Sequence, residues 1–242
     1  WLLILFPIFF ILGNSAMNLF TVMFCIVSLI YFFKNEVKFS FKYLEIILLI
    51  FCLLLITSTI TKNGNVFKSI SYLRFFILFY FCSYFLRHKL IDIKKLFNVY
   101  SIIVLVVSID LIIQHFIGYN IFGFKINNTG ATSFFVDERI AGSFIKNFGF
   151  FLVLLIFTRY KNNKFTDVIY TTILLSLINI SIFVTMQRMP MIVWAVFLLI
   201  YGSIYYKRKL KSIIISFLIL FLFIINPSSC LLYTSPSPRD GL

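Results

Sequence analysis

Long apolar runs, separated by short polar stretches, repeat along the whole chain. A helix needs about 20 apolar residues to cross a bilayer, and most of the runs approach that length. The runs that we expect to be helices cover residues 2–12, 16–33, 43–60, 70–86, 96–117, 146–158, 167–186, 190–206 and 212–225. Unbroken runs of this kind fit helices rather than the alternating strands of a barrel. The pattern therefore predicts an all-α, polytopic transmembrane bundle of about nine spans, the first of them truncated.

The polar stretches between the runs differ in length. Residues 118–145 form the longest, and we expect a long loop there between the fifth and sixth spans. Gly13-Asn14-Ser15 indicates a tight turn, and a very short turn holds Gln187 and Arg188. The remaining connections are mostly short and basic.

Composition places the chain in a bilayer. Hydrophobic residues make up 61% and charged residues 12%, with a mean hydropathy of +1.02. Soluble domains have roughly 45–50% apolar and 25% charged residues. A chain as apolar as this one could not keep its surface wetted in water.

The formal net charge of +14 requires a separate explanation. A basic protein can bind nucleic acid, but these Lys and Arg residues form short clusters between apolar runs, without a nucleic-acid motif. The loops after the second, fourth, sixth and eighth spans hold fourteen of them, and the opposite side holds seven. The positive-inside rule makes the richer side cytoplasmic. We therefore expect a multi-pass membrane protein, with the 118–145 loop and Arg188 on the outer face.

Both ends of the sequence depart from this pattern. Trp1 lies inside an apolar run, so we expect the N-terminus of the protein to lie upstream. From Cys230 onward the composition changes abruptly, and its reverse translation resembles a transposase-based sequencing adapter. A Pro/Ser-rich disordered tail is the alternative. We expect a transmembrane domain over 1–229, incomplete at both ends, and a segment over 230–242 that is not native.

Arg188 lies between two spans and therefore at a membrane interface. Pro190 suits the first turn of the following helix, because the N–H that it lacks has no intrahelical partner there. Arg188 is thus close to a helix N-terminus, whose free amides attract anions, and its planar guanidinium suits two-point contact with phosphate oxygens. The alternative is an arginine that extends to the lipid headgroups. The residues alone leave both readings open.

Arg139 lies in the long loop, on the same side as Arg188. Its acidic neighbours, Asp137 and Glu138, favour a locally paired and solvated charge. Gly142 follows three residues later and would let backbone approach a ligand or a neighbouring helix closely. We interpret the two arginines as a candidate anion clamp at the outer face.

Asp110 and Gln114 lie one helical turn apart and share a face near the outer end of their span. A buried aspartate in a span is costly unless it is paired, so it marks either a structural pair or a functional group. Arg74 is a basic residue that could pair with it. His115 is more typical of an amphipathic interface position than of a catalytic base.

Metal or cofactor chemistry has little support in the residues. The side chains of Asp137 and Glu138 diverge because they are adjacent, and no other loop carboxylate joins them. No P-loop, G-x-S-x-G, H-E-x-x-H or C-x-x-C pattern occurs. We expect neither a metal nor a cofactor.

Three short motifs, in one order and on one side, resemble a known family. They are Asp110-x-x-x-Gln114-x-x-x-Gly118-x-Asn120-Ile121-Phe122-Gly123, Arg139-x-x-Gly142-x-Phe144 and Thr185-x-x-Arg188. The combination resembles the superfamily of O-antigen ligases and O-antigen polymerases, over residues 110–190. The resemblance implies a polytopic glycosyltransferase of the C type in the bacterial inner membrane. It would take a glycan from undecaprenyl pyrophosphate at the periplasmic face, without a metal. Ligases of this family deliver the glycan to lipid A core, and polymerases deliver it to another repeat unit.

The resemblance also implies roles for particular residues. Arg139 and Arg188 would bind the pyrophosphate and stabilise it as the leaving group, and we place Arg74, Asp110, Gln114 and Gly142 with them as candidate substrate-binding residues. The large outer loop with the histidine base of the family would follow Asn226, where the adapter-like sequence begins, so we expect this fragment to be inactive. The stretch after Phe144 lacks the acidic residue that the family often has, which leaves the subfamily open. A carrier-lipid transporter and a non-catalytic membrane subunit are the alternative functions.

Overall fold

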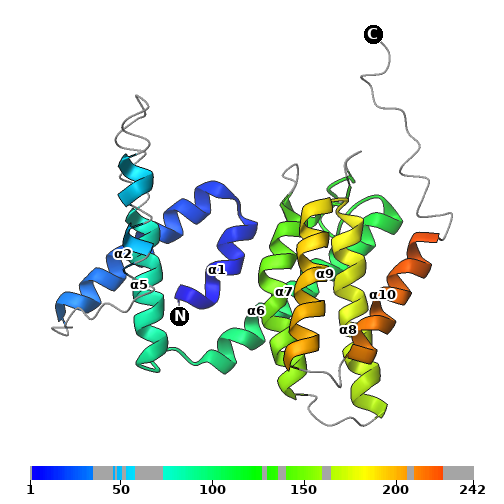
Figure 1. Cartoon of the computed structure of the whole chain (residues 1–242). Coiled ribbons are helices and arrows are strands. Elements are labelled where there is room, and N and C mark those ends of the chain that lie inside the picture. The colour runs from blue at the N-terminus through cyan, green and yellow to red at the C-terminus, as the bar shows by residue number, and fades with distance from the viewer. Residues whose placement is uncertain are drawn as a thin grey trace. The chain divides into compact units, whose positions relative to one another are not determined.

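The computed structural model describes residues 2–34, 46, 48–50, 53–57, 73–126, 130–135, 140–159, 165–205 and 210–225. The helices are α1 (Leu2–Ile11), α2 (Asn14–Lys34), α5 (Leu73–Arg87), α6 (Ile93–Ile117), the 3₁₀ helix η1 (Ser133–Phe135), α7 (Ala141–Arg159), α8 (Phe165–Val184), α9 (Arg188–Tyr205) and α10 (Leu210–Ile225) (Figure 1). Within these ranges there is no strand, and Tyr119 and Lys125 form an isolated antiparallel bridge. The prediction of an all-α fold is confirmed for the described residues.

The helices follow the apolar runs closely, with one clear exception. The structure starts α7 at Ala141, so the predicted loop over 118–145 was too long and the sixth span over 146–158 too short. The polar residues of this segment suggested a loop, but its residues Ala141, Phe144 and Ile145 are fully buried. The N–H of Phe144 donates to the Ile140 carbonyl at 2.8 Å and closes the first helical turn. Most of the third predicted span, 43–60, lies outside the described residues, as does the segment 230–242.

Four described helical segments are long and apolar enough to cross a membrane: Asn14–Lys34, Ile93–Ile117, Ala141–Thr158 and Thr166–Val184. Shorter apolar helices include Phe76–Arg87, Arg188–Ser203 and Lys211–Ile224. Large apolar side chains lie exposed along these helices; Ile102 is 60% exposed and Leu222 is 65% exposed. Such surfaces are costly in water and suited to hydrocarbon. The chain is therefore a membrane protein, and its total of nine spans stays a prediction.

The chain divides into two compact units, residues 1–96 and 97–242. In the first unit, α2 packs against α1 and α5. Its core is aromatic and contains Phe20, Phe24, Tyr80 and Phe81, all at most 3% exposed. Gly13, at a φ of +97°, makes the left-handed turn between α1 and α2 that the sequence predicts.

In the second unit, α8 packs against α7 and α10, and α7 also packs against α9. A buried polar chain joins three of these helices. The indole N–H of Trp194 donates to Asn179 Oδ1 at 2.8 Å, and the Asn179 amide donates to Ser216 Oγ at 3.1 Å. Consecutive helices from α7 to α10 run antiparallel, so the start of α7, the end of α8 and the start of α9 gather at one end of the unit (Figure 1).

Candidate functional site

The structure describes one of the two arginines of the candidate clamp. Arg188 is the first residue of α9, and it is exposed. Arg139 lies outside the described residues, together with Asp137 and Glu138. Arg74 lies in the first turn of α5, in the first unit, and is partly buried. Its carbonyl accepts a hydrogen bond from the Cys25 thiol at 3.6 Å.

The turn that precedes Arg188 is tightly enclosed. It comprises Thr185 to Gln187, and Met186 has a left-handed φ of 55°. The hydroxyl of Thr185 donates to the Ile182 carbonyl at 2.7 Å, which holds that side chain against the end of α8. The N–H of Met191 donates to the Gln187 carbonyl at 3.4 Å, so Gln187 is the residue from which α9 begins.

Two glycines from the preceding loop and helix contact this turn. A Cβ at Gly142 would lie 2.6 Å from Thr185 Oγ1 and 2.8 Å from Gln187 Oε1. A Cβ at Gly130 would lie 2.7 Å from the Thr185 carbonyl oxygen, and Gly130 has a φ of +116° that favours glycine in any case. Gly130 faces backbone, so only glycine fits there, whereas a Cβ at Gly142 would require the Thr185 and Gln187 side chains to shift. The close approach that Gly142 predicts is confirmed, and the neighbour is the turn before Arg188.

Asp110 and Gln114 share one face of α6, as their spacing predicts, and both are completely buried. The carboxylate of Asp110 accepts a hydrogen bond from the Ser133 hydroxyl and another, at 3.0 Å, from the backbone N–H of Ile121. The sequence left Arg74 open as a partner; the bonds that the structure shows for Asp110 come from the 118–135 segment instead.

Gln114 binds the same segment through both ends of its amide. Its Oε1 accepts from the N–H groups of Thr132 and Ser133, at 2.9 and 2.7 Å. Its Nε2 donates to the carbonyls of Phe124 and Lys125, at 3.2 and 3.4 Å. One side chain thus bonds four backbone groups, and two of them, the N–H groups of the buried Thr132 and Ser133, depend on it as their acceptor. These contacts position the loop, and contact of Asp110 or Gln114 with a substrate stays a prediction.

Sequence reasoning missed Ser133 and underused Asn120. Asn120 Oδ1 accepts from the N–H groups of Phe122 and Phe124, at 3.0 and 2.8 Å, and its Nδ2 donates to the Ser133 carbonyl at 3.0 Å. The Asn-x-x-Gly spacing of Asn120 and Gly123 is a turn signal that could have revealed the local part. Ser133 carries no such signal, because its hydroxyl meets a carboxylate from another element.

His115 is partly buried and lies among aromatic rings. Its ring centroid is 5.9 Å from that of Phe223 on α10 and 5.4 Å from that of Phe116. Its Nδ1 is buried and has no hydrogen-bond partner among the residues that the structure describes. The contacts are those of a packing residue.

The described residues contain no group of three or more His, Cys, Asp or Glu side chains that could hold a metal ion. The site is instead a rigid corner of the second unit. The buried amide and carboxylate of α6 hold the 118–135 segment, and Gly130 and Gly142 hold the start of α7 against the turn before Arg188. Comparison of the chain with protein-family models, with curated proteins and with solved structures found no match.

Proposed function

We propose that the chain is part of an O-antigen ligase-like or polymerase-like glycosyltransferase of the C type. It would transfer a glycan from undecaprenyl pyrophosphate, at the periplasmic face of the bacterial inner membrane, to lipid A core or to another repeat unit. The observation that supports this function best is the contact of Gly142 with Thr185 and Gln187.

This contact matters because an arginine lies close in the chain to each of the two segments that it joins. Arg188 directly follows Gln187, and Arg139 precedes Gly142 by three residues. Three residues span at most about 11 Å of extended chain. Under this proposal, Arg139 and Arg188 act at the same corner of the molecule, although they are far apart in sequence. Two guanidinium groups at one corner suit a diphosphate, whose two phosphoryl groups accept paired hydrogen bonds.

The start of α9 adds a further favourable term for an anion. Pro190, in the first turn, has no N–H, so the free amides of that turn belong to Arg188 and Met189. Free amides and the helix dipole favour negative charge at this position. A leaving pyrophosphate gains charge as the glycosidic bond breaks, and preorganised donors stabilise that charge more than they stabilise the ground state.

Replacement of either arginine in the full-length protein of the native host tests the proposal. We expect Arg188→Ala and Arg139→Ala to abolish surface polysaccharide at an unchanged level of membrane-inserted protein. Arg188→Lys should rescue little, because an ammonium cannot make the two-point contact. Lys146→Ala, on the first turns of α7, is the matched control and should leave the polysaccharide intact. Normal polysaccharide in both alanine variants would exclude the catalytic assignment.

A further inference from the structure

A cavity of about 460 Å³ lies in the first unit. Its walls come from α1, α2, the end of α5 and the α5–α6 turn, and they are mainly apolar; Phe24, Val27, Phe85 and Leu90 are among the lining residues. The volume is that of a typical small-molecule pocket, which ranges from about 300 to 1,000 Å³. A cavity lined this way in a membrane protein suits a hydrocarbon chain.

One serine lies in the part of the wall that α2 forms. Ser28, on α2, lines the cavity and is 1% exposed. Its Oγ is buried and has no hydrogen-bond partner in the part of the chain that the structure describes. A buried hydroxyl without a partner is costly.

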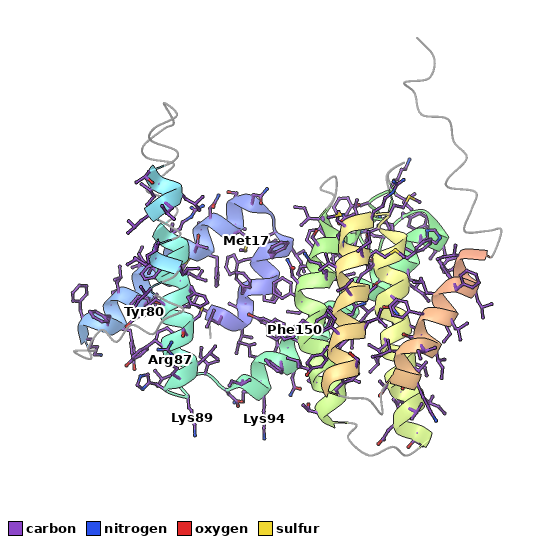
Figure 2. All side chains as sticks on the ribbon, in the orientation of Figure 1. Met17, Tyr80, Arg87, Lys89, Lys94 and Phe150 are labelled. Carbon is purple, nitrogen blue, oxygen red and sulfur yellow. The ribbon has the colours of Figure 1, made fainter. Side chains whose placement is uncertain are left out.

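The cavity ends at a strongly basic turn. Lys95 and Asp92 line it, and Arg87, Lys89 and Lys94 belong to the same turn. Figure 2 shows Lys89 and Lys94 directed away from the helices on one side of this turn. Asp92 caps α6, because its Oδ1 accepts from the N–H groups of Lys94 and Lys95 at 3.0 and 3.2 Å. The turn therefore carries a net positive charge. An apolar chain without a charged headgroup would not neutralise it.

Backbone geometry holds this basic turn in place. The N–H of Leu90 donates to the Phe85 carbonyl at 3.0 Å, and the N–H of Lys89 donates to the Leu86 carbonyl at 3.2 Å. These two bonds close α5 with a Schellman motif. Lys89 has a φ of +54° at the position where glycine is usual. Lys89 thus has a backbone conformation that is strained for a residue with a side chain, and a glycine at this position would relieve the strain.

We propose that the first unit binds an anionic glycerophospholipid of the bilayer, with one acyl chain in the cavity and its phosphate at the basic turn. The chain fits the apolar walls, and the phosphate matches the positive excess of the turn, in which Asp92 offsets Lys95 at 4.0 Å and Arg87, Lys89 and Lys94 supply the remaining charge. Basic pockets between helices on the cytoplasmic side are suited to such headgroups. The site takes no part in the proposed glycan transfer and does not rest on it.

Photo-crosslinking of the purified full-length protein in nanodiscs tests the site. Phosphatidylglycerol and phosphatidylcholine with the same diazirine-bearing acyl chain are compared, and the labelled residues are mapped by mass spectrometry. We expect phosphatidylglycerol to label α2 around Val27 and the end of α5 around Phe85, with a yield about tenfold above that of phosphatidylcholine. Equal labelling by the two lipids, or labels confined to outward-facing side chains, would overturn the proposal.

Two variants separate the headgroup from the cavity. Lys89→Gly combined with Lys95→Gln removes two charges, and the glycine relieves backbone strain, so loss of labelling cannot be ascribed to unfolding. Ser28→Phe fills the cavity and should abolish labelling by both lipids. Lys211→Gln on α10 and Leu19→Phe on the exposed side of α2 are the matched controls and should change nothing. Full labelling in the charge variant would likewise contradict the assignment.

Discussion

At the scale of single residues, Gly142 shows how a missing side chain shapes the site. Helix interiors disfavour glycine by about 1 kcal/mol relative to alanine, yet α7 has Gly142 at its second residue. The reason is the 2.6 Å that would separate a Cβ from Thr185 Oγ1. A Cβ at this position would force the side chains of Thr185 and Gln187 to move.

We predict that Gly142→Ala destabilises the protein despite the better helix propensity of alanine. Overpacking of a close contact costs roughly 1–3 kcal/mol, and the displaced turn directly precedes Arg188. The measurement is the apparent Tm in detergent together with surface polysaccharide in the host. Thr185→Ala should partly rescue Gly142→Ala, because it removes the nearest atom, and a double-mutant cycle quantifies the coupling.

Ser143→Ala, at the next position of α7, is the matched control and should be close to neutral. Additive effects of Gly142→Ala and Thr185→Ala, without rescue, would show that the contact is not the cause of any loss.

At the scale of elements, the segment over 118–135 is organised by one helix. The described residues of this segment have little regular structure apart from η1, yet Asn120, Ala131, Thr132 and Ser133 are at most 2% exposed. Buried irregular backbone needs partners for its N–H and C=O groups. Asp110 and Gln114 supply them, which explains why α6 carries polar side chains near its end.

We predict that Gln114→Leu loosens this segment while α6 stays helical. The substitution keeps the apolar volume but leaves the N–H groups of Thr132 and Ser133 without their acceptor, at a cost of about 1–3 kcal/mol for each unsatisfied group. Limited proteolysis from the outer side of oriented vesicles should then cut between residues 118 and 135 much faster than in the unchanged protein.

His115→Phe is the control for this experiment, because it changes the adjacent position and keeps an aromatic ring beside Phe223. Equal cleavage rates in Gln114→Leu and the unchanged protein would mean that the amide does not hold the segment.

At the scale of the whole molecule, the distribution of charge predicts the orientation in the membrane. Lys89 and Lys211 belong to the basic side, and Lys125 belongs to the poorer side. All three are exposed. The structure contains no membrane, so the orientation rests on the positive-inside rule.

Cysteine labelling tests this orientation. In a variant without its own cysteines, Lys125→Cys should react with a membrane-impermeant maleimide added to intact spheroplasts. Lys89→Cys and Lys211→Cys should react only after permeabilisation. The reverse result would place the 118–135 segment in the cytoplasm and exclude a periplasmic reaction.

The sequence by itself determined which segments are helical and that the chain belongs in a membrane. Hydrocarbon leaves a backbone no hydrogen-bond partner except its own, so a long apolar run becomes a helix whatever surrounds it. That rule is local, and it placed most of the described helices within a few residues. It failed at Ala141, where burial by distant elements made a polar-looking segment helical.

Only the tertiary structure decided what meets at the candidate site. Thr185 closes on Gly142, Ser133 donates to Asp110, and Lys95 lines a cavity with Phe24, and the partners in each pair are well separated along the chain. The spacing of apolar residues predicts which face of a helix is buried, but it does not predict which element covers that face. These contacts depend on how the helices pack, because a close approach or a hydrogen bond is set by a few ångströms in space rather than by the order of residues in the chain.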